Sequence, residues 1–69
     1  MDPDKAYFLE QAKRGLKRAT VLAEQGRRAA AQHALRDAHA DYYKLGKDFT
    51  DSDFQQEFNQ LFDKLYAGL

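Results

Sequence analysis

Residues 49–54 read Phe-Thr-Asp-Ser-Asp-Phe, and no other stretch of this chain marks a helix start so clearly. With Thr50 as the N-cap, Asp53 lies at the third helical position, where its carboxylate can reach back to the cap. Phe49 and Phe54 then occupy the two positions of a hydrophobic staple. These local signals predict that a helix begins at this point.

The predicted helix carries two rows of hydrophobic side chains. A second register, with Ser52 as the cap and Gln55 three residues later, would start it two residues further on. Either start leads into one row formed by Phe54, Phe58, Leu61 and Leu65 and a neighbouring row formed by Phe62, Tyr66 and Leu69. We expect a helix over residues 51–66. Because the two rows are wider than one neighbouring helix covers, it either packs over the groove between two helices or leaves part of its surface as an interface.

Two further helices are predicted upstream. Asp2-Pro3-Asp4 is typical of a helix start, because Asp2 can cap, proline suits the first helical position and Asp4 meets the positive end of the helix dipole. Hydrophobic residues then recur at spacings of three and four in two stripes, first Leu9, Ala12, Leu16, Ala19 and Ala23, and then Ala31, Leu35, Ala38, Tyr42 and Leu45. We expect helices over residues 3–25 and 27–45.

Gly26 separates the two stripes. A glycine at this point can adopt the left-handed conformation that ends a helix, which favours an antiparallel hairpin. Glycine inside a helix costs only about 1 kcal/mol, so one long helix through Gly26 is the alternative. Gly46 follows the second stripe and is placed to end that helix in the same way.

The composition agrees with an all-α fold. The 69 residues include one proline, no tryptophan and few β-branched residues, and they are rich in helix formers. We expect a single helical domain over residues 1–69, a small hairpin with a third helix packed on it. A core of this size stabilises a fold by only about 3–5 kcal/mol, and without cysteine no disulfide can add to it. We therefore expect a helical homodimer whose interface comprises Phe58, Phe62, Tyr66 and Leu69.

Several function classes are disfavoured at this stage. No apolar run approaches the roughly 18 residues that a membrane helix needs, and the N-terminal residues do not resemble a signal peptide, so we expect a cytoplasmic protein without membrane contact. His33, Asp37 and Asp41 share one helical face at spacings of four, but they lack a fourth metal ligand. Ser52, the one serine, serves a helix cap. We expect no enzyme activity, no metal and no cofactor.

The net charge of zero hides a polarised chain. Residues 1–36 carry eight basic and four acidic side chains, whereas residues 37–69 carry three basic and seven acidic ones. Four of the basic residues form one face of the first helix, namely Lys13, Arg14, Lys17 and Arg18. This face is interpreted either as a solvated surface partly neutralised by the acidic third helix, as a docking patch for an acidic protein surface, or as a phosphate contact.

Tyrosines supply a further candidate surface. Tyr42 lies on the stripe of the second helix, and its neighbour Tyr43 must point about 100° away. Tyrosine and arginine are enriched at interface hot spots. We therefore predict that a partner protein contacts Lys13, Arg14, Lys17, Arg18, Tyr42 and Tyr43, although a tyrosine at the edge of the core, with its hydroxyl in water, is the alternative for both rings.

The stretch that contains Ala19, Leu22, Gly26, Ala31, Leu35 and Ala38 resembles one tetratricopeptide-type helical hairpin. In such hairpins small residues and a turn glycine let two helices approach closely. The likeness covers about twenty residues, lacks the closing proline, because Tyr43 stands there, and has no second copy. It implies a similar hairpin and not a repeat protein.

In length, helical texture and high content of arginine, alanine and glutamine, the whole chain also resembles small phage-encoded proteins that bind and inhibit host proteins, such as the quorum-sensing anti-activator class of Pseudomonas phages. No motif carries this resemblance, so no residue role is transferred. The resemblance implies an early phage protein that forms a helical dimer and occupies functional surfaces of host regulators.

We therefore expect a small non-enzymatic module that binds another protein and inhibits or regulates it. Two alternatives remain. A nucleic-acid-binding regulator would place the basic face of the first helix on phosphates. A structural subunit would bury its aromatic surface in a larger helical assembly.

Overall fold

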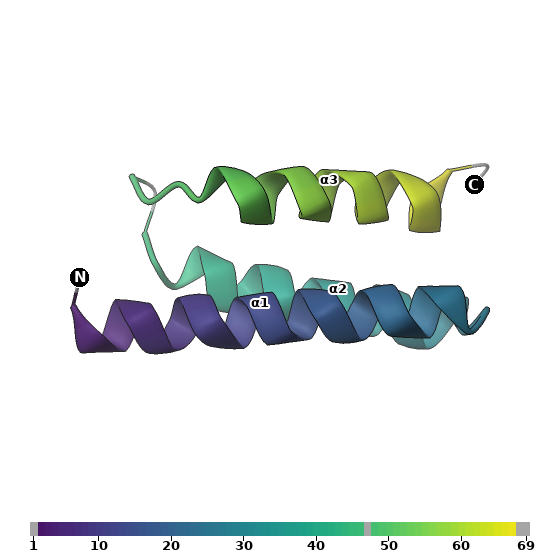
Figure 1. The fold of residues 1–69 in the computed structure, drawn as a ribbon, viewed down its shortest axis with the longest axis horizontal. Coiled ribbons are helices and arrows are strands. Elements are labelled where there is room, and N and C mark those ends of the chain that lie inside the picture. Colours follow the sequence, from purple (N-terminus) through teal and green to yellow (C-terminus); the bar gives the residue numbers. More distant parts are fainter. Residues whose placement is uncertain (1, 47, 68–69) are drawn as a thin grey trace.

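The computed structural model describes residues 2–46 and 48–67, and all three expected helices are present (Figure 1). They are α1 (Pro3–Glu24), α2 (Arg28–Tyr43) and α3 (Ser52–Tyr66). α1 and α2 form an antiparallel hairpin, and α3 forms a second layer on one side of it (Figure 1). The all-α prediction is confirmed, and the ends of each helix lie within two residues of the predicted ones.

The turn between α1 and α2 forms as the hairpin prediction requires, so the alternative of one long helix is wrong. Gly26 has φ of 76°, a left-handed conformation that side chains disfavour. The Arg27 N–H donates to the Leu22 carbonyl and the Gly26 N–H donates to the Ala23 carbonyl, both at 3.0 Å. This is the Schellman arrangement, and it satisfies the carbonyls that the end of α1 exposes.

The end of α2 differs from the prediction by two residues. The helix ends at Tyr43 and not at residue 45, because the next three amides each donate to the carbonyl three residues back, at 3.1–3.2 Å. This tighter turn brings the chain to Gly46, which has φ of 101°. Leu45 is still buried, so the turn closes one end of the core.

Small residues bring α1 and α2 close together. Four alanines on the facing stripes are completely buried: Ala12, Ala19, Ala31 and Ala38. Between them lies Gly15, where a Cβ would stand 3.0 Å from the Ala38 Cβ and 3.3 Å from the Ala38 Cα. Leu16 and Leu35 are the largest side chains that are fully buried. We call this contact the small-residue seam.

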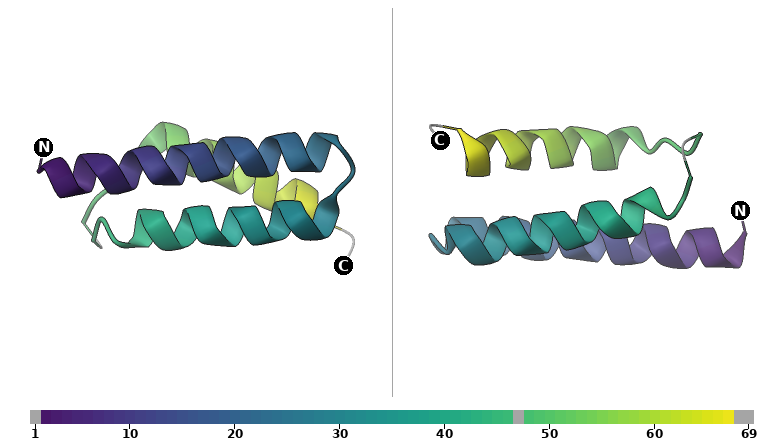
Figure 2. Two further views of the ribbon diagram at one scale, coloured as in Figure 1. Left: turned by 90° about the horizontal axis from the view of Figure 1, so that it is seen from below. Right: turned by 180° about the vertical axis from the view of Figure 1, so that it is seen from behind.

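α3 covers one side of the seam. Phe54, Leu61 and Leu65 are buried against the hairpin and belong to the same hydrophobic cluster as the seam residues. The helix runs antiparallel to α2 and crosses the hairpin obliquely, from α1 towards the start of α2 (Figure 2). One of the two arrangements left open by the sequence is therefore present, because α3 lies over the groove between the other two helices. The interface on its remaining surface stays a prediction.

The seam predicts an unusual effect of Gly15→Ala. Intrinsic helix propensity favours alanine by up to about 1 kcal/mol, but the added Cβ would overpack the contact with Ala38, at a cost of about 1–3 kcal/mol. We expect Gly15→Ala to lower the free energy of unfolding, measured by urea denaturation. The double variant Gly15→Ala/Ala38→Gly should show favourable coupling, because it moves the missing Cβ to the other helix. A stabilised Gly15→Ala protein would show that the helices do not approach so closely.

Candidate interaction surface

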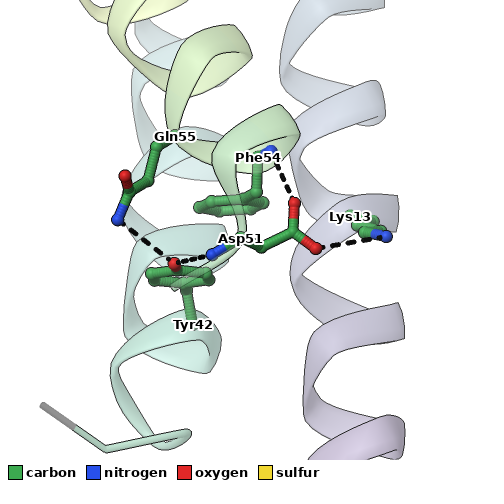
Figure 3. Close-up of polar contacts among 5 residues, drawn as sticks. All are labelled: Lys13, Tyr42, Asp51, Phe54 and Gln55. Carbon is green, nitrogen blue, oxygen red and sulfur yellow. Dashed lines mark hydrogen bonds and ion pairs between the residues drawn. The ribbon is translucent and has the colours of Figure 1, made fainter. Parts of the chain in front are cut away.

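One cluster holds the start of α3 on the hairpin (Figure 3). The Tyr42 hydroxyl accepts hydrogen bonds from the Asp51 backbone N–H at 2.9 Å and from the Gln55 side-chain amide at 3.4 Å. The Tyr42 ring stacks on Phe54, with centroids 4.3 Å apart and planes 4° from parallel. Asp51 Oδ2 lies 3.7 Å from Lys13 Nζ. All three helices therefore meet at Asp51.

The predicted N-cap is wrong in its register. Asp51, and not Thr50 or Ser52, caps α3, since its Oδ1 accepts from the Phe54 N–H at 2.9 Å. The reason is tertiary, because Tyr42 holds the backbone of Asp51 and Lys13 attracts its carboxylate. Tyr42 also pairs edge-on with Phe49, at 6.0 Å between centroids. Its ring thus links both residues that were expected to form the staple.

A second cluster caps the other end of α3. Arg28 Nε donates to the Leu65 carbonyl at 2.8 Å, and its NH2 group donates to the Ala67 carbonyl at 3.1 Å. Gln32 also donates to Leu65, at 3.0 Å. A cation near the C-terminal, negative end of a helix dipole is stabilising, so the Arg28 guanidinium interacts favourably with the end of α3. Sequence reasoning missed it, because the partners are more than thirty residues apart and no local pattern links them.

These two clusters hold α3 against α2 and leave a row of rings on the outer side of their junction. We call this row the aromatic strip, and its members are His39, Tyr43, Phe58, Phe62 and Tyr66. Successive ring centroids lie 5.5 Å (Tyr43–His39), 5.1 Å (His39–Phe58), 6.0 Å (Phe58–Phe62) and 4.6 Å (Phe62–Tyr66) apart. Tyr43 is 68% exposed and Phe62 is 45% exposed. The strip is therefore continuous and open to solvent.

The aromatic strip unites residues that the sequence assigned to two surfaces. Tyr43 was predicted to contact a partner, whereas Phe58, Phe62 and Tyr66 were predicted to form a dimer interface. Tyr42 points the other way, into the junction with α3, which agrees with its place on the hydrophobic stripe. Leu69, the fourth predicted dimer residue, lies outside the described residues.

The predicted basic face of α1 is divided between two sides of the hairpin. Lys13 and Lys17 line an open groove between α1 and α3, of about 730 Å³, together with Asp53 and Glu57. Arg14 pairs with Glu10 at 2.9 Å on the exposed side of α1. Arg18 lines a separate hollow between α1 and α2. The acidic third helix therefore neutralises part of this face, as one of the three interpretations predicts.

The predicted candidate metal ligands do not come together in the described residues. No group of three His, Asp or Glu side chains in residues 2–46 and 48–67 is placed to hold a metal ion. His33 and Asp37 instead line the hollow between α1 and α2 beside Arg18. In the same part of the chain, no helix has the length and hydrophobicity to cross a membrane.

Comparison with protein-family models, curated proteins and solved structures finds no match to this chain. The arrangement of its own side chains therefore carries the functional argument.

The junction of Tyr42 with Asp51 gives a matched pair of variants. Tyr42→Phe keeps the ring that stacks on Phe54 and removes the acceptor for the Asp51 N–H, so we expect the free energy of unfolding to fall by about 1 kcal/mol. Tyr43→Phe, at the neighbouring exposed position, should leave stability unchanged. Urea denaturation measures both, and equal effects of the two variants would contradict the assigned role of Tyr42.

Capping of α3 by Arg28 is tested in the same way. Arg28→Ala should destabilise the chain by about 1 kcal/mol, a modest value because the guanidinium is exposed. Amide hydrogen exchange should also become faster in the last turn of α3. Arg36→Ala, two turns further along α2, provides the control and should change neither quantity. Unchanged exchange in Arg28→Ala would show that the cap does not hold α3.

Proposed function

We propose that this protein is a non-enzymatic interaction module that binds another protein through the aromatic strip. The observation that carries the proposal is the continuous row of five rings along the α2–α3 junction, in which His39, Tyr43 and Phe62 are exposed to solvent. Aromatic side chains bury a large area with few rotatable bonds, and for that reason they dominate binding hot spots.

The scaffold under the strip supports this use. Phe58 and Tyr66 are half-buried and pack on the hydrophobic core, so their rings are held in place before any partner arrives. α3 is fixed at its start by Asp51 and at its end by Arg28. A preorganised row of rings loses little conformational entropy on binding, which favours affinity.

The resemblance to small phage-encoded inhibitors suggests what such binding would achieve. A chain that occupies a regulator's surface inhibits it without chemistry of its own. We propose that the protein acts in this way in the cytoplasm, as a phage-encoded inhibitor or anti-activator of a host transcriptional regulator or another host protein. The support for this step is the length, composition and helical fold alone.

The predicted homodimer would use the same rings, because Phe58, Phe62 and Tyr66 belong to the aromatic strip. One surface holds one occupant at a time. Self-association and partner binding would therefore compete, and a dimer would act as a reservoir from which a partner draws the monomer.

The nucleic-acid alternative has less support. Phosphate binding needs a surface of cations, but Lys13 faces Asp51, Arg14 faces Glu10, and Asp53 and Glu57 line the groove beside Lys17. A structural subunit that buries the aromatic strip in a larger assembly stays compatible with the geometry, and the experiment below separates it from a regulatory partner.

Capture from a lysate of the native host tests the proposal. A tagged chain should retain a discrete protein after nuclease treatment, and Phe62→Ala and Tyr43→Ala should each reduce that capture by about tenfold or more. Tyr7→Ala provides the matched control, since Tyr7 is 59% exposed on α1 and lies outside the strip.

Loss of capture on nuclease treatment would overturn the proposal. So would a loss of capture in Arg18→Glu when Phe62→Ala and Tyr43→Ala both still capture the protein. Capture of the chain itself as an extended assembly would favour the structural subunit.

A further inference from the structure

The charges around the aromatic strip are not balanced, although the chain as a whole is neutral. Acidic side chains of α2 and α3 gather on the sides that face α1. Asp53 and Glu57 line the α1–α3 groove, and Asp37 lines the α1–α2 hollow. Asp41 pairs with Lys44 at 3.5 Å, and Asp51 approaches Lys13. The outer side of the α2–α3 junction is thus left without most of the acidic residues.

Basic side chains remain on the α2 margin of the strip. Arg36 precedes His39 by three residues and Tyr43 by seven, so it lies on the same side of α2. It is exposed, and among the described residues it takes part in no ion pair. Arg28 lies two turns before Arg36 on α2, and among the described residues its guanidinium contacts the backbone carbonyls of Leu65 and Ala67 and no carboxylate. This margin is therefore positive.

The opposite margin is close to neutral. On α3, Gln55 and Asn59 follow the outer edge of the strip, and Asp63 is the one acidic side chain of that helix on the same side. A surface with aromatic rings along its middle and cations along one edge recognises a matching pattern, a hydrophobic row with carboxylates on one side.

The strip also has a length that suits a helix. Phe58, Phe62 and Tyr66 recur at every fourth position and extend about 12 Å along α3. Tyr43, on α2, lengthens the row of rings further. Beside Tyr43 the surface is hollowed, with about 310 Å³ between the strip and the turn that includes Gly46 and Phe49. A partner helix of three to four turns could cover the rings and place one large side chain in this hollow.

We propose that the occupant of the aromatic strip is an acidic amphipathic helix of the partner protein, with its hydrophobic side on the rings and its carboxylates along Arg36 and Arg28. This inference rests on the proposed function and names the chemistry of its partner. A second copy of the chain is a poorer match, because in the part of the chain that the structure describes Asp63 is the one carboxylate that α3 places beside the strip. A dimer with its two α3 helices antiparallel would also bring the two Arg36 margins together.

Two labelled peptides test the proposal on the full chain. Each is a capped helix of about 14 residues with leucines and phenylalanine on one side, and they differ only in carrying glutamates or lysines along the flank of that side. We expect the glutamate peptide to bind at least about tenfold more tightly than the lysine peptide, as measured by fluorescence anisotropy. Its affinity should also fall when salt is raised from about 50 mM to about 200 mM.

Charge-reversed variants locate the effect. Arg36→Glu should remove the preference for the glutamate peptide, whereas Arg18→Glu, the same change on α1, should preserve it. Phe62→Ala and Tyr43→Ala should weaken the binding of both peptides, with the helical content checked by circular dichroism. If Arg36→Glu and Arg18→Glu both lose the preference for the glutamate peptide, the preference depends on the net charge of the chain and not on Arg36, and the proposal is overturned.

Three other results would also overturn it. Equal binding of the two peptides, lost in Phe62→Ala, would show that the strip takes a hydrophobic helix without an acidic preference and would leave the proposed function in place. If neither peptide binds, but the chain still captures a protein and Phe62→Ala abolishes that capture, the partner surface is not an amphipathic helix of this kind. A dimer that is seen by sedimentation equilibrium at the assay concentration, dispersed by Phe62→Ala and not displaced by the glutamate peptide would identify a second copy as the occupant.

Discussion

The close approach of α1 and α2 through the small-residue seam determines the rest of the structure. With alanines and Gly15 between them, the two helices leave a narrow groove, which accepts the central row of α3 but not its whole aromatic sector. Phe54, Leu61 and Leu65 fill that groove. The remaining rings of α3 therefore lie towards α2, where Phe58 contacts His39 and His39 in turn contacts Tyr43. The aromatic strip is the consequence of a core made of small side chains.

Local and periodic features of the fold could be predicted from sequence, because they depend on neighbouring residues. The stripes of α1 and α2 and the additional hydrophobic row of α3 that contains Phe62 follow from spacing, and the left-handed turn follows from a glycine, Gly26, at the end of the first stripe. The cap at Asp51 and the cap by Arg28 could not be predicted, since each depends on a partner from another helix. For the same reason, Tyr43 was assigned to a different surface from Phe62, although the structure brings both into one row.

Ion pairing gives this neutral chain a directional surface. The acidic second half folds back on α1, where Asp51, Asp53 and Glu57 face the lysines of the first half. That arrangement reduces the charge of the predicted basic face and simultaneously removes carboxylates from the α2–α3 junction. Arg36 is left beside exposed rings, a combination that is enriched at protein interfaces. The two sides of the molecule thus differ in the positions of their charged side chains, although the net charge of the chain is zero.

The exposed aromatic strip and the buried Tyr42–Phe54 junction are tested by aromatic NMR on the free protein, with a soluble paramagnetic agent that broadens exposed protons. We expect nuclear Overhauser contacts from the His39 ring to the Phe58 ring, strong broadening at Tyr43 and Phe62, and protection of Tyr42 and Phe54. A Phe62 ring that is as well protected as Phe54, or a Tyr42 ring that is as strongly broadened as Tyr43, would contradict this expectation. In the first case the strip would be covered, and in the second α3 would not be held on the hairpin as described.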